Sequence, residues 1–280
     1  MWRVEKPTID AGETFATCIS RVRNPEMKSN LLAIRADIET AENEYSEMAE
    51  NGELHIFPQI DTVGLVPGSE MVKTYEGRMA KKGQPGRPIY DQIKLLPEND
   101  RCPFCDHRNI STLDHVLPKQ HYPILAVTPI NLVACCSDCN KLKLDVAPTN
   151  KSDIIIHPYF DVVNNRKWLN AEVIESSPAA LIFNVIEVAE WDNTLNERVT
   201  HHFILLDLAN LYSKQAAREM SDIRLNLQRH FDLGGAEAVR TELKFQWESR
   251  RANRINSWQT ATYEALSKSD WFCETGFAQT

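Results

Sequence analysis

Four cysteines arranged as two C-x-x-C pairs constrain the fold of this chain more than any other feature of its sequence. Cys102 pairs with Cys105 and Cys136 with Cys139, and thirty residues separate the two pairs. Each pair can form a tight knuckle that presents two thiolates, and two knuckles make a closed tetrahedral zinc site. Because closed coordination leaves no position for a substrate, we expect this Zn²⁺ to hold the fold rather than to catalyse. Cys135 competes with Cys136 as a ligand; the two-residue spacing favours Cys136, which leaves Cys135 as a small apolar side chain.

The cysteine count also bears on the compartment. It is odd, at seven, and residues 1–20 lack the basic start and apolar centre of a signal peptide, which argues against a disulfide framework. The most apolar stretch, 179–188, is about half the length of a membrane span and contains Asn184 and Glu187. We therefore expect a cytoplasmic protein with no membrane association.

The charge of the chain is uneven. The net charge of −8 and a pI near 5.5 differ from the basic balance that is typical of proteins that bind nucleic acid. The acidic excess lies before Gly52, whereas seven basic and four acidic side chains stand between Arg78 and Arg108. A basic patch on an acidic body is compatible with this distribution, so the overall charge does not exclude a nucleic-acid substrate.

Three short motifs lie between and after the cysteine pairs: LDHVLPK at 113–119, NLVA at 131–134 and CSDCNKLK at 136–143. Taken in this order, over about forty residues, they resemble the HNH endonucleases of the ββα-metal fold. The third signature position holds Asn140 where many members have histidine, a common variant. The resemblance implies a small zinc-stapled ββα core and a phosphodiester hydrolase that leaves a 5′-phosphate and a 3′-hydroxyl.

The residues of these motifs suit that chemistry. Hydrolysis of a phosphodiester needs an activated water, and a histidine that titrates near neutrality can take its proton. A hard divalent cation stabilises the charge that develops on the phosphate and the leaving oxygen. Asp114 and Asn140 offer a carboxylate and an amide oxygen, ligands that favour Mg²⁺ or Mn²⁺ over softer metals.

The resemblance also implies a role for each residue. His115 is the general base, Asp114 and Asn140 bind the catalytic metal, and Asn131 bonds across the loop to hold the site together. Neighbouring side chains on a strand point to opposite faces, so Asp114 and His115 reach one phosphate only if the first strand is locally distorted. Three lysines are candidates for contacts with the nucleic-acid backbone: Lys119, Lys141 and Lys143.

A less specific resemblance concerns the region after the motif. The sequence HPYFD at 157–161 and Trp168 look like the region that follows this motif in HNH proteins of bacterial defence and mobile elements. That likeness implies DNA as the substrate and a partner such as the ATPase of Septu-type systems. Two alternatives stay open: a non-catalytic zinc module that binds nucleic acid or a partner protein, and an HNH nuclease that acts on RNA.

The rest of the chain predicts an α+β fold that is mainly helical. Asn24 and Pro25 are typical of a helix start, and the apolar stripe that follows predicts one helix over 25–50. Further elements are predicted as a helix over 69–79, strands over 153–157, 171–175 and 181–188, and long helices over 212–231 and 236–267. We expect a helical N-terminal region over 1–68, the nuclease domain over 69–151, and a C-terminal region of short strands and two long helices over 152–280.

Overall fold

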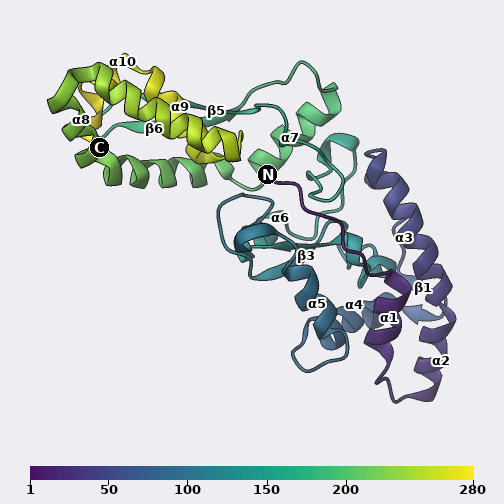
Figure 1. The fold of residues 1–280 in the computed structure, drawn as a ribbon. Coiled ribbons are helices and arrows are strands. Elements are labelled where there is room, and N and C mark those ends of the chain that lie inside the picture. The colour runs from purple at the N-terminus through teal and green to yellow at the C-terminus, as the bar shows by residue number, and fades with distance from the viewer. The chain divides into compact units, whose positions relative to one another are not determined.

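The computed structural model describes residues 1–280 and divides into two compact units, Met1–Val162 and Val163–Thr280. We call them the N-terminal and the C-terminal unit (Figure 1). The chain is a mixture of helices and three two-stranded antiparallel sheets. The first two regions predicted from the sequence, and the beginning of the third, lie in the N-terminal unit.

Three helices open the N-terminal unit: α1 (Ala11–Ile19), α2 (Pro25–Ala33) and α3 (Arg35–Glu50). Asn24 caps α2 as expected, because its side chain accepts a hydrogen bond from the Met27 amide. The single helix predicted over 25–50 is wrong, since the backbone leaves helical geometry at Ile34. The side chain of Ile34 is nevertheless buried in the same core as its neighbours. The apolar spacing therefore continues across the break, and for that reason the sequence pattern does not reveal it.

A two-stranded hairpin and two helices come next in the chain, and they pack against a second hairpin. The strands β1 (Thr62–Val63) and β2 (Val66–Pro67) precede α4 (Gly68–Thr74), which continues as a π-helix over Tyr75–Ala80, and α5 (Arg87–Lys94) follows. Their apolar side chains share one core with those of the next two strands. These strands, β3 (Thr112–His115) and β4 (Leu132–Cys135), pair antiparallel and lead into α6 (Ser137–Lys143).

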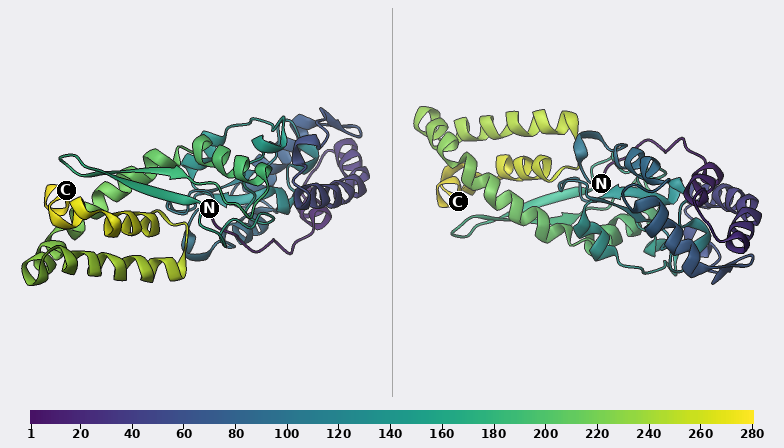
Figure 2. Two further views of the ribbon diagram at one scale, coloured as in Figure 1. Left: turned by 90° about the horizontal axis from the view of Figure 1, so that it is seen from above. Right: turned by 90° about the horizontal axis from the view of Figure 1, so that it is seen from below.

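In the C-terminal unit a hairpin packs against long helices. The strands β5 (Leu169–Ile174) and β6 (Ala180–Val185) alternate buried and exposed side chains, as a half-covered sheet requires. The buried face packs against α8 (Leu208–Asn253) and α9 (Trp258–Lys268), and Figure 2 shows the hairpin lying along these helices in both views. The helices α7 (Asn193–Leu205) and α10 (Asp270–Glu274) complete the unit.

Two predictions for the C-terminal half need correction. The helix predicted over 236–267 ends at Asn253, and Ser257 caps a separate helix, α9. The glycines Gly234 and Gly235 do interrupt α8, and Gly235 has a φ of 64° that glycine tolerates best. The strand predicted over 153–157 is absent: the isoleucines Ile154 and Ile156 are buried, but the segment pairs with no other strand.

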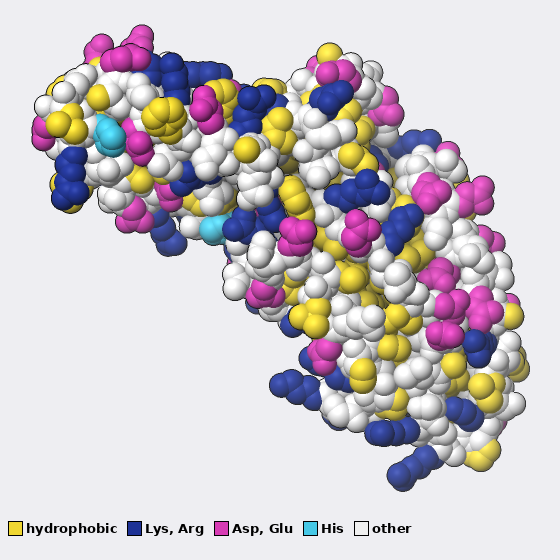
Figure 3. Space-filling model, viewed as in Figure 1, with side chains coloured by type: hydrophobic (Ala, Val, Ile, Leu, Met, Phe, Trp, Pro, Cys, Tyr) yellow, Lys and Arg dark blue, Asp and Glu magenta, His cyan; other side chains and the backbone are white.

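The surface reflects the uneven charge of the sequence. Figure 3 shows acidic side chains gathered over α3 on the face drawn, where Asp37, Glu44 and Glu47 are exposed.

None of the helices combines the length and the apolar character that crossing a bilayer would require.

Candidate functional site

The four paired cysteines meet in one buried cluster. The sulfurs of Cys102, Cys105, Cys136 and Cys139 all lie within 4.8 Å of one another. Cys105 Sγ and Cys136 Sγ are 4.0 Å apart, too far for a disulfide. Sulfurs at the corners of a tetrahedron around Zn²⁺ lie about 3.8 Å apart, given Zn–S bonds near 2.3 Å. The cluster therefore fits a zinc ion.

Local backbone geometry forms each knuckle. The Arg108 amide donates to Cys105 Sγ at 3.4 Å, and the Cys139 amide donates to Cys136 Sγ at the same distance. Cys136 is the N-cap of α6, so its sulfur lies at the helix N-terminus, where negative charge is favoured. Hydrogen bonds within the cluster lower the pKa of Cys105 and Cys136, whereas burial raises that of Cys102 and hydrogen bonds with the other thiols raise that of Cys139.

The structure decides which of the adjacent residues Cys135 and Cys136 belongs to the cluster. Cys135 is the last residue of β4, where it pairs with Thr112, and it is not part of the cluster. It is fully buried, and burial raises the pKa of its thiol well above the ordinary value. Cys135 is thus a neutral core side chain, while Cys136 supplies the fourth sulfur.

The strand β3 carries the predicted acid and base at its end. Asp114 is opposite Val133 and His115 opposite Leu132 in the β3–β4 ladder, and both side chains are buried. The His115 ring packs edge-on against Tyr75 at 4.4 Å, whereas the Asp114 carboxylate faces Lys143 of α6. The ladder is regular through His115, so the local distortion of the strand that we expected is not seen in its pairing, and the two side chains have different neighbours.

One hydrogen bond decides which nitrogen of His115 carries a proton. His115 Nε2 lies 2.8 Å from the carbonyl oxygen of Ala126. Because a carbonyl can only accept, Nε2 is the protonated nitrogen and Nδ1 keeps the lone pair of the neutral ring. Burial lowers the pKa of His115 to about 3, so the ring is neutral at physiological pH. The ring is thus in the form that accepts a proton, but its pKa lies well below the near-neutral value expected from the sequence for a general base.

Asn131 closes the loop that joins the two strands. Its Oδ1 accepts from the Leu117 amide at 2.8 Å, and its Nδ2 donates to the Leu117 carbonyl at 3.0 Å. Nδ2 also lies 3.4 Å from the carbonyl of Leu125, close to the carbonyl that holds His115. The side chain is fully buried. It thereby pins the loop segment that orients the imidazole.

The helix α6 brings the second half of the site to β3. Cys136, Asn140 and Lys143 are spaced four and three residues apart and so share one face of the helix. Lys143 Nζ donates to the His115 carbonyl at 2.7 Å and lies 3.4 Å from Asp114 Oδ2, which places that face against the end of β3. Asn140 lies one turn before this contact and is half-buried.

The three predicted phosphate-binding lysines have different surroundings. Lys141 is exposed on α6. Lys119 lies 3.6 Å from Glu76 and over the ring of Tyr75, the ring that packs on His115. Lys143 is only 5% exposed, and its ammonium lies inside the site rather than on its surface.

The carboxylate of Asp114 suits a hard cation. Its Oδ2 atom is buried and accepts no hydrogen bond of good geometry, but it forms an ion pair with the Lys143 ammonium at 3.4 Å. Burial raises the pKa of Asp114, and the nearby Lys143 opposes that shift. Carboxylate and carboxamide oxygens are the hard donors that Mg²⁺ prefers, so Asp114 and Asn140 are the residues of the predicted site that could hold such an ion.

Three contributors to the site were missed from the sequence. Tyr75, which packs on His115, comes from the π-helix, and the Ala126 carbonyl is a backbone group with no residue-type signal. The inward orientation of Lys143 depends on the packing of α6 against β3. Only the helical spacing from Asn140 to Lys143 could have indicated it.

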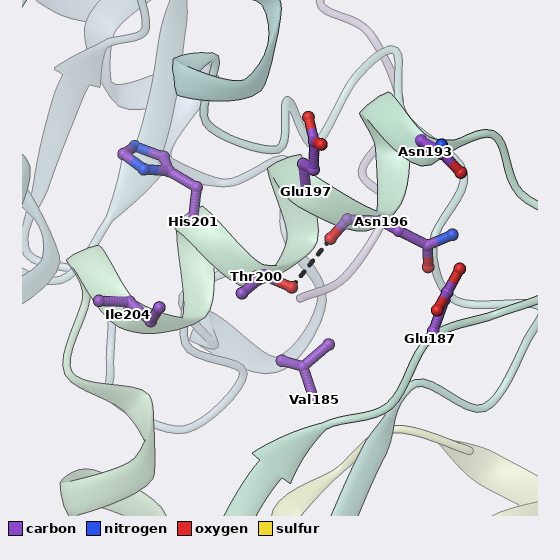
Figure 4. A pocket seen from close by; sticks show the side chains of 8 residues that line it. All are labelled: Val185, Glu187, Asn193, Asn196, Glu197, Thr200, His201 and Ile204. Carbon is purple, nitrogen blue, oxygen red and sulfur yellow. Dashed lines mark hydrogen bonds between the residues drawn. The ribbon is translucent and has the colours of Figure 1, made fainter.

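A cavity outside this site lies in the C-terminal unit. It has a volume of about 610 Å³ and is open to solvent between the end of β6 and α7. Figure 4 shows its lining, including the bond from the Thr200 hydroxyl to the Asn196 carbonyl at 3.0 Å. None of the residues predicted from the sequence as functional lines this cavity.

Comparison with known proteins gives two matches. The chain is 27% identical to the protein ea31 of Escherichia phage lambda over 293 aligned positions, which cover 97% of this chain and 99% of that protein. It is also 32% identical to the Septu protein PtuB of Bacillus thuringiensis over 85 positions, which cover 29% of this chain and 32% of PtuB. No protein-family model matches the sequence, and no solved structure matches it.

Proposed function

We propose that this protein is a metal-dependent endonuclease of the HNH type that hydrolyses phosphodiester bonds of DNA. The observation that carries the proposal is the β3–β4–α6 unit, in which a cysteine cluster fixes a short helix against the strand that bears Asp114 and His115. A module that served only to bind zinc would need the cysteines but neither a buried carboxylate nor an oriented imidazole beside them.

Each residue then has a defined task. His115 accepts the proton of the attacking water at Nδ1, while the Ala126 carbonyl holds Nε2–H and fixes the ring. Asp114 and Asn140 would hold a Mg²⁺ ion, which supplies stabilisation of the charge on the phosphate and the leaving oxygen. The cysteine cluster, with Zn²⁺, fixes the first turn of α6 and thus the backbone of Asn140, and Asn131 holds the loop. Lys119 and Lys141 contact the nucleic-acid backbone.

The biological context that we propose is defence against phage or foreign DNA, in a complex with a partner such as an ATPase. The local similarity to the Septu protein PtuB supports this context. The acidic surface over α3 is consistent with a nuclease that depends on a partner to reach DNA.

A plasmid-nicking assay tests the activity. We expect the zinc-loaded protein to cleave supercoiled DNA when Mg²⁺ is added, and His115→Ala to lower the rate at least about a hundredfold, because the general base is lost. The zinc content of His115→Ala stays unchanged. The matched control His230→Ala removes a histidine on α8 in the C-terminal unit and keeps full activity. Equal cleavage by His115→Ala and the wild type would overturn the proposal.

The same preparation decides between DNA and RNA. Duplex DNA and single-stranded RNA are incubated in parallel with the wild type and His115→Ala. We expect Mg²⁺-dependent cleavage of the DNA that His115→Ala lacks. Cleavage confined to RNA would keep the catalytic residues and overturn the assignment of the substrate.

A further inference from the structure

We infer that Lys143 is a positioning residue that ties the last turn of α6 to the end of β3 and so holds Asn140 beside Asp114. The inference rests on the proposed function, because it concerns the same pair of metal ligands. It gives Lys143 a role inside the protein in place of a contact with phosphate.

The burial of Lys143 is the first observation. Lysine is among the residues least often buried, yet only 5% of Lys143 is exposed. Its ammonium lies 2.7 Å from the His115 carbonyl and 3.4 Å from Asp114 Oδ2. Both oxygens belong to β3, so one side chain connects the helix to the two adjacent residues on which the proposed chemistry depends.

The backbone after Lys143 is the second observation. Leu144 has φ 57° and ψ −167°, a conformation that is essentially confined to glycine. Its side chain is 64% exposed, so apolar burial of that side chain does not hold it there. A leucine keeps such a conformation only where the surrounding structure fixes the chain. The buried, bonded Lys143 immediately before it supplies that constraint.

The third observation is the position of Asn140 between two attachments. The helix α6 has only seven residues, too few to be stable without tertiary contacts. Cys136 and Cys139 attach its first turn to the metal cluster, and Lys143 attaches its last turn to β3. Asn140 shares a face with Cys136 and Lys143, so its carboxamide depends on both attachments.

Manganese binding to the zinc-loaded full-length protein tests the inference. Free Mn²⁺ is measured by electron paramagnetic resonance as protein is titrated. We expect Lys143→Met to weaken Mn²⁺ binding about tenfold or more, the usual effect of losing a residue that orients a ligand. Lys82→Met removes an equal charge at an exposed position of the same unit and leaves the Mn²⁺ affinity unchanged.

Amide hydrogen exchange distinguishes a structural role of Lys143, which holds the last turn of α6, from an effect of its charge on Mn²⁺ binding. If Lys143 holds the last turn of α6, exchange at residues 140–144 is faster in Lys143→Met, while the zinc-bound first turn is unaffected. Lys143→Gln is the second variant, because its carboxamide is too short to reach both oxygens of β3 but keeps a polar group in the buried site, which preserves the fold if Lys143→Met does not fold. We expect the same two changes in Lys143→Gln, with zinc content unchanged.

The reference variant Asp114→Ala distinguishes failure of the inference from failure of the proposed function. If Asp114→Ala leaves Mn²⁺ binding intact, the proposed metal site is wrong, and the exchange data alone still decide whether Lys143 is a tether. If Asp114→Ala abolishes Mn²⁺ binding, unchanged or tighter binding in the Lys143 variants overturns the inference. Weaker binding with unchanged exchange would also overturn it, since that result assigns the effect to charge.

Discussion

The buried carboxamide of Asn131 makes two hydrogen bonds to the backbone of Leu117, at 2.8 and 3.0 Å, and a longer one to the Leu125 carbonyl. It thereby imitates a backbone pairing across the loop between β3 and β4 and leaves no buried amide or carbonyl of Leu117 without a partner. The loop includes the Ala126 carbonyl that orients His115. A residue that never touches a substrate can therefore decide the geometry of the proposed base.

Asn131→Ala should lower the free energy of unfolding by about 3 kcal/mol, because it leaves two buried backbone groups unsatisfied at 1–3 kcal/mol each. Urea denaturation followed by circular dichroism measures the change. Asn170→Ala is the matched control: its amide bonds only partly exposed side chains on the β5–β6 hairpin, and its effect should stay within about 0.5 kcal/mol. Equal losses in the two variants would contradict the role given to Asn131.

At the residue scale, the sequence was most informative where motif spacing fixes geometry. The four clustered cysteines were predicted from their spacing, and the structure brings all four together. The metal-binding role of Asp114 and the base role of His115 stay predictions. The Ala126 carbonyl was beyond the sequence, because any residue at that position would offer the same oxygen. The burial of Lys143 depends on how α6 packs and not on residue type alone.

At the scale of elements, the cysteine cluster brings together two segments that are distant in the sequence. The first knuckle precedes β3, and the second opens α6. Arg108 near the first knuckle pairs with Asp138 of the second at 2.8 Å, but that pair is partly exposed and contributes little. A metal ion held by the four cysteines would therefore be the principal connection between the knuckles.

Exchange of neighbouring cysteines tests that connection. Cys136→Ser should lose the bound zinc and lower the thermal unfolding midpoint, because one thiolate ligand and the anchor of α6 are removed together. Cys135→Ser changes the adjacent residue, which is buried outside the cluster, and should keep one zinc per chain. Elemental analysis and thermal denaturation give both readings. Zinc retained by Cys136→Ser and lost by Cys135→Ser would reverse the assignment of the fourth ligand.

The sequence predicted whether a segment is a helix or a strand more often than it predicted where that element begins and ends. The two strands predicted over 171–175 and 181–188 and the glycine break in α8 were confirmed, since strand-like composition and Gly234-Gly235 are local signals. The break at Ile34 was missed because the apolar spacing continues through it. The segment 153–157 has strand-like composition, but a strand also needs a partner, which local sequence does not provide.

At the scale of the whole molecule, the two matches differ in extent. The similarity to ea31 extends over 97% of the chain and thus includes both units, whereas the similarity to PtuB covers 29%. The candidate site lies wholly within the N-terminal unit. The C-terminal unit adds a helix-covered hairpin and an open cavity but none of the predicted catalytic residues.

Anomalous X-ray scattering from crystals of the zinc-loaded protein soaked in Mn²⁺ tests the central claim most directly, because it locates both metals independently of activity. The account predicts a zinc peak among the four cysteine sulfurs and a separate manganese peak bound by the Asp114 carboxylate and the Asn140 carboxamide. A manganese peak elsewhere, or zinc alone in a crystal whose site is open to solvent, would contradict it.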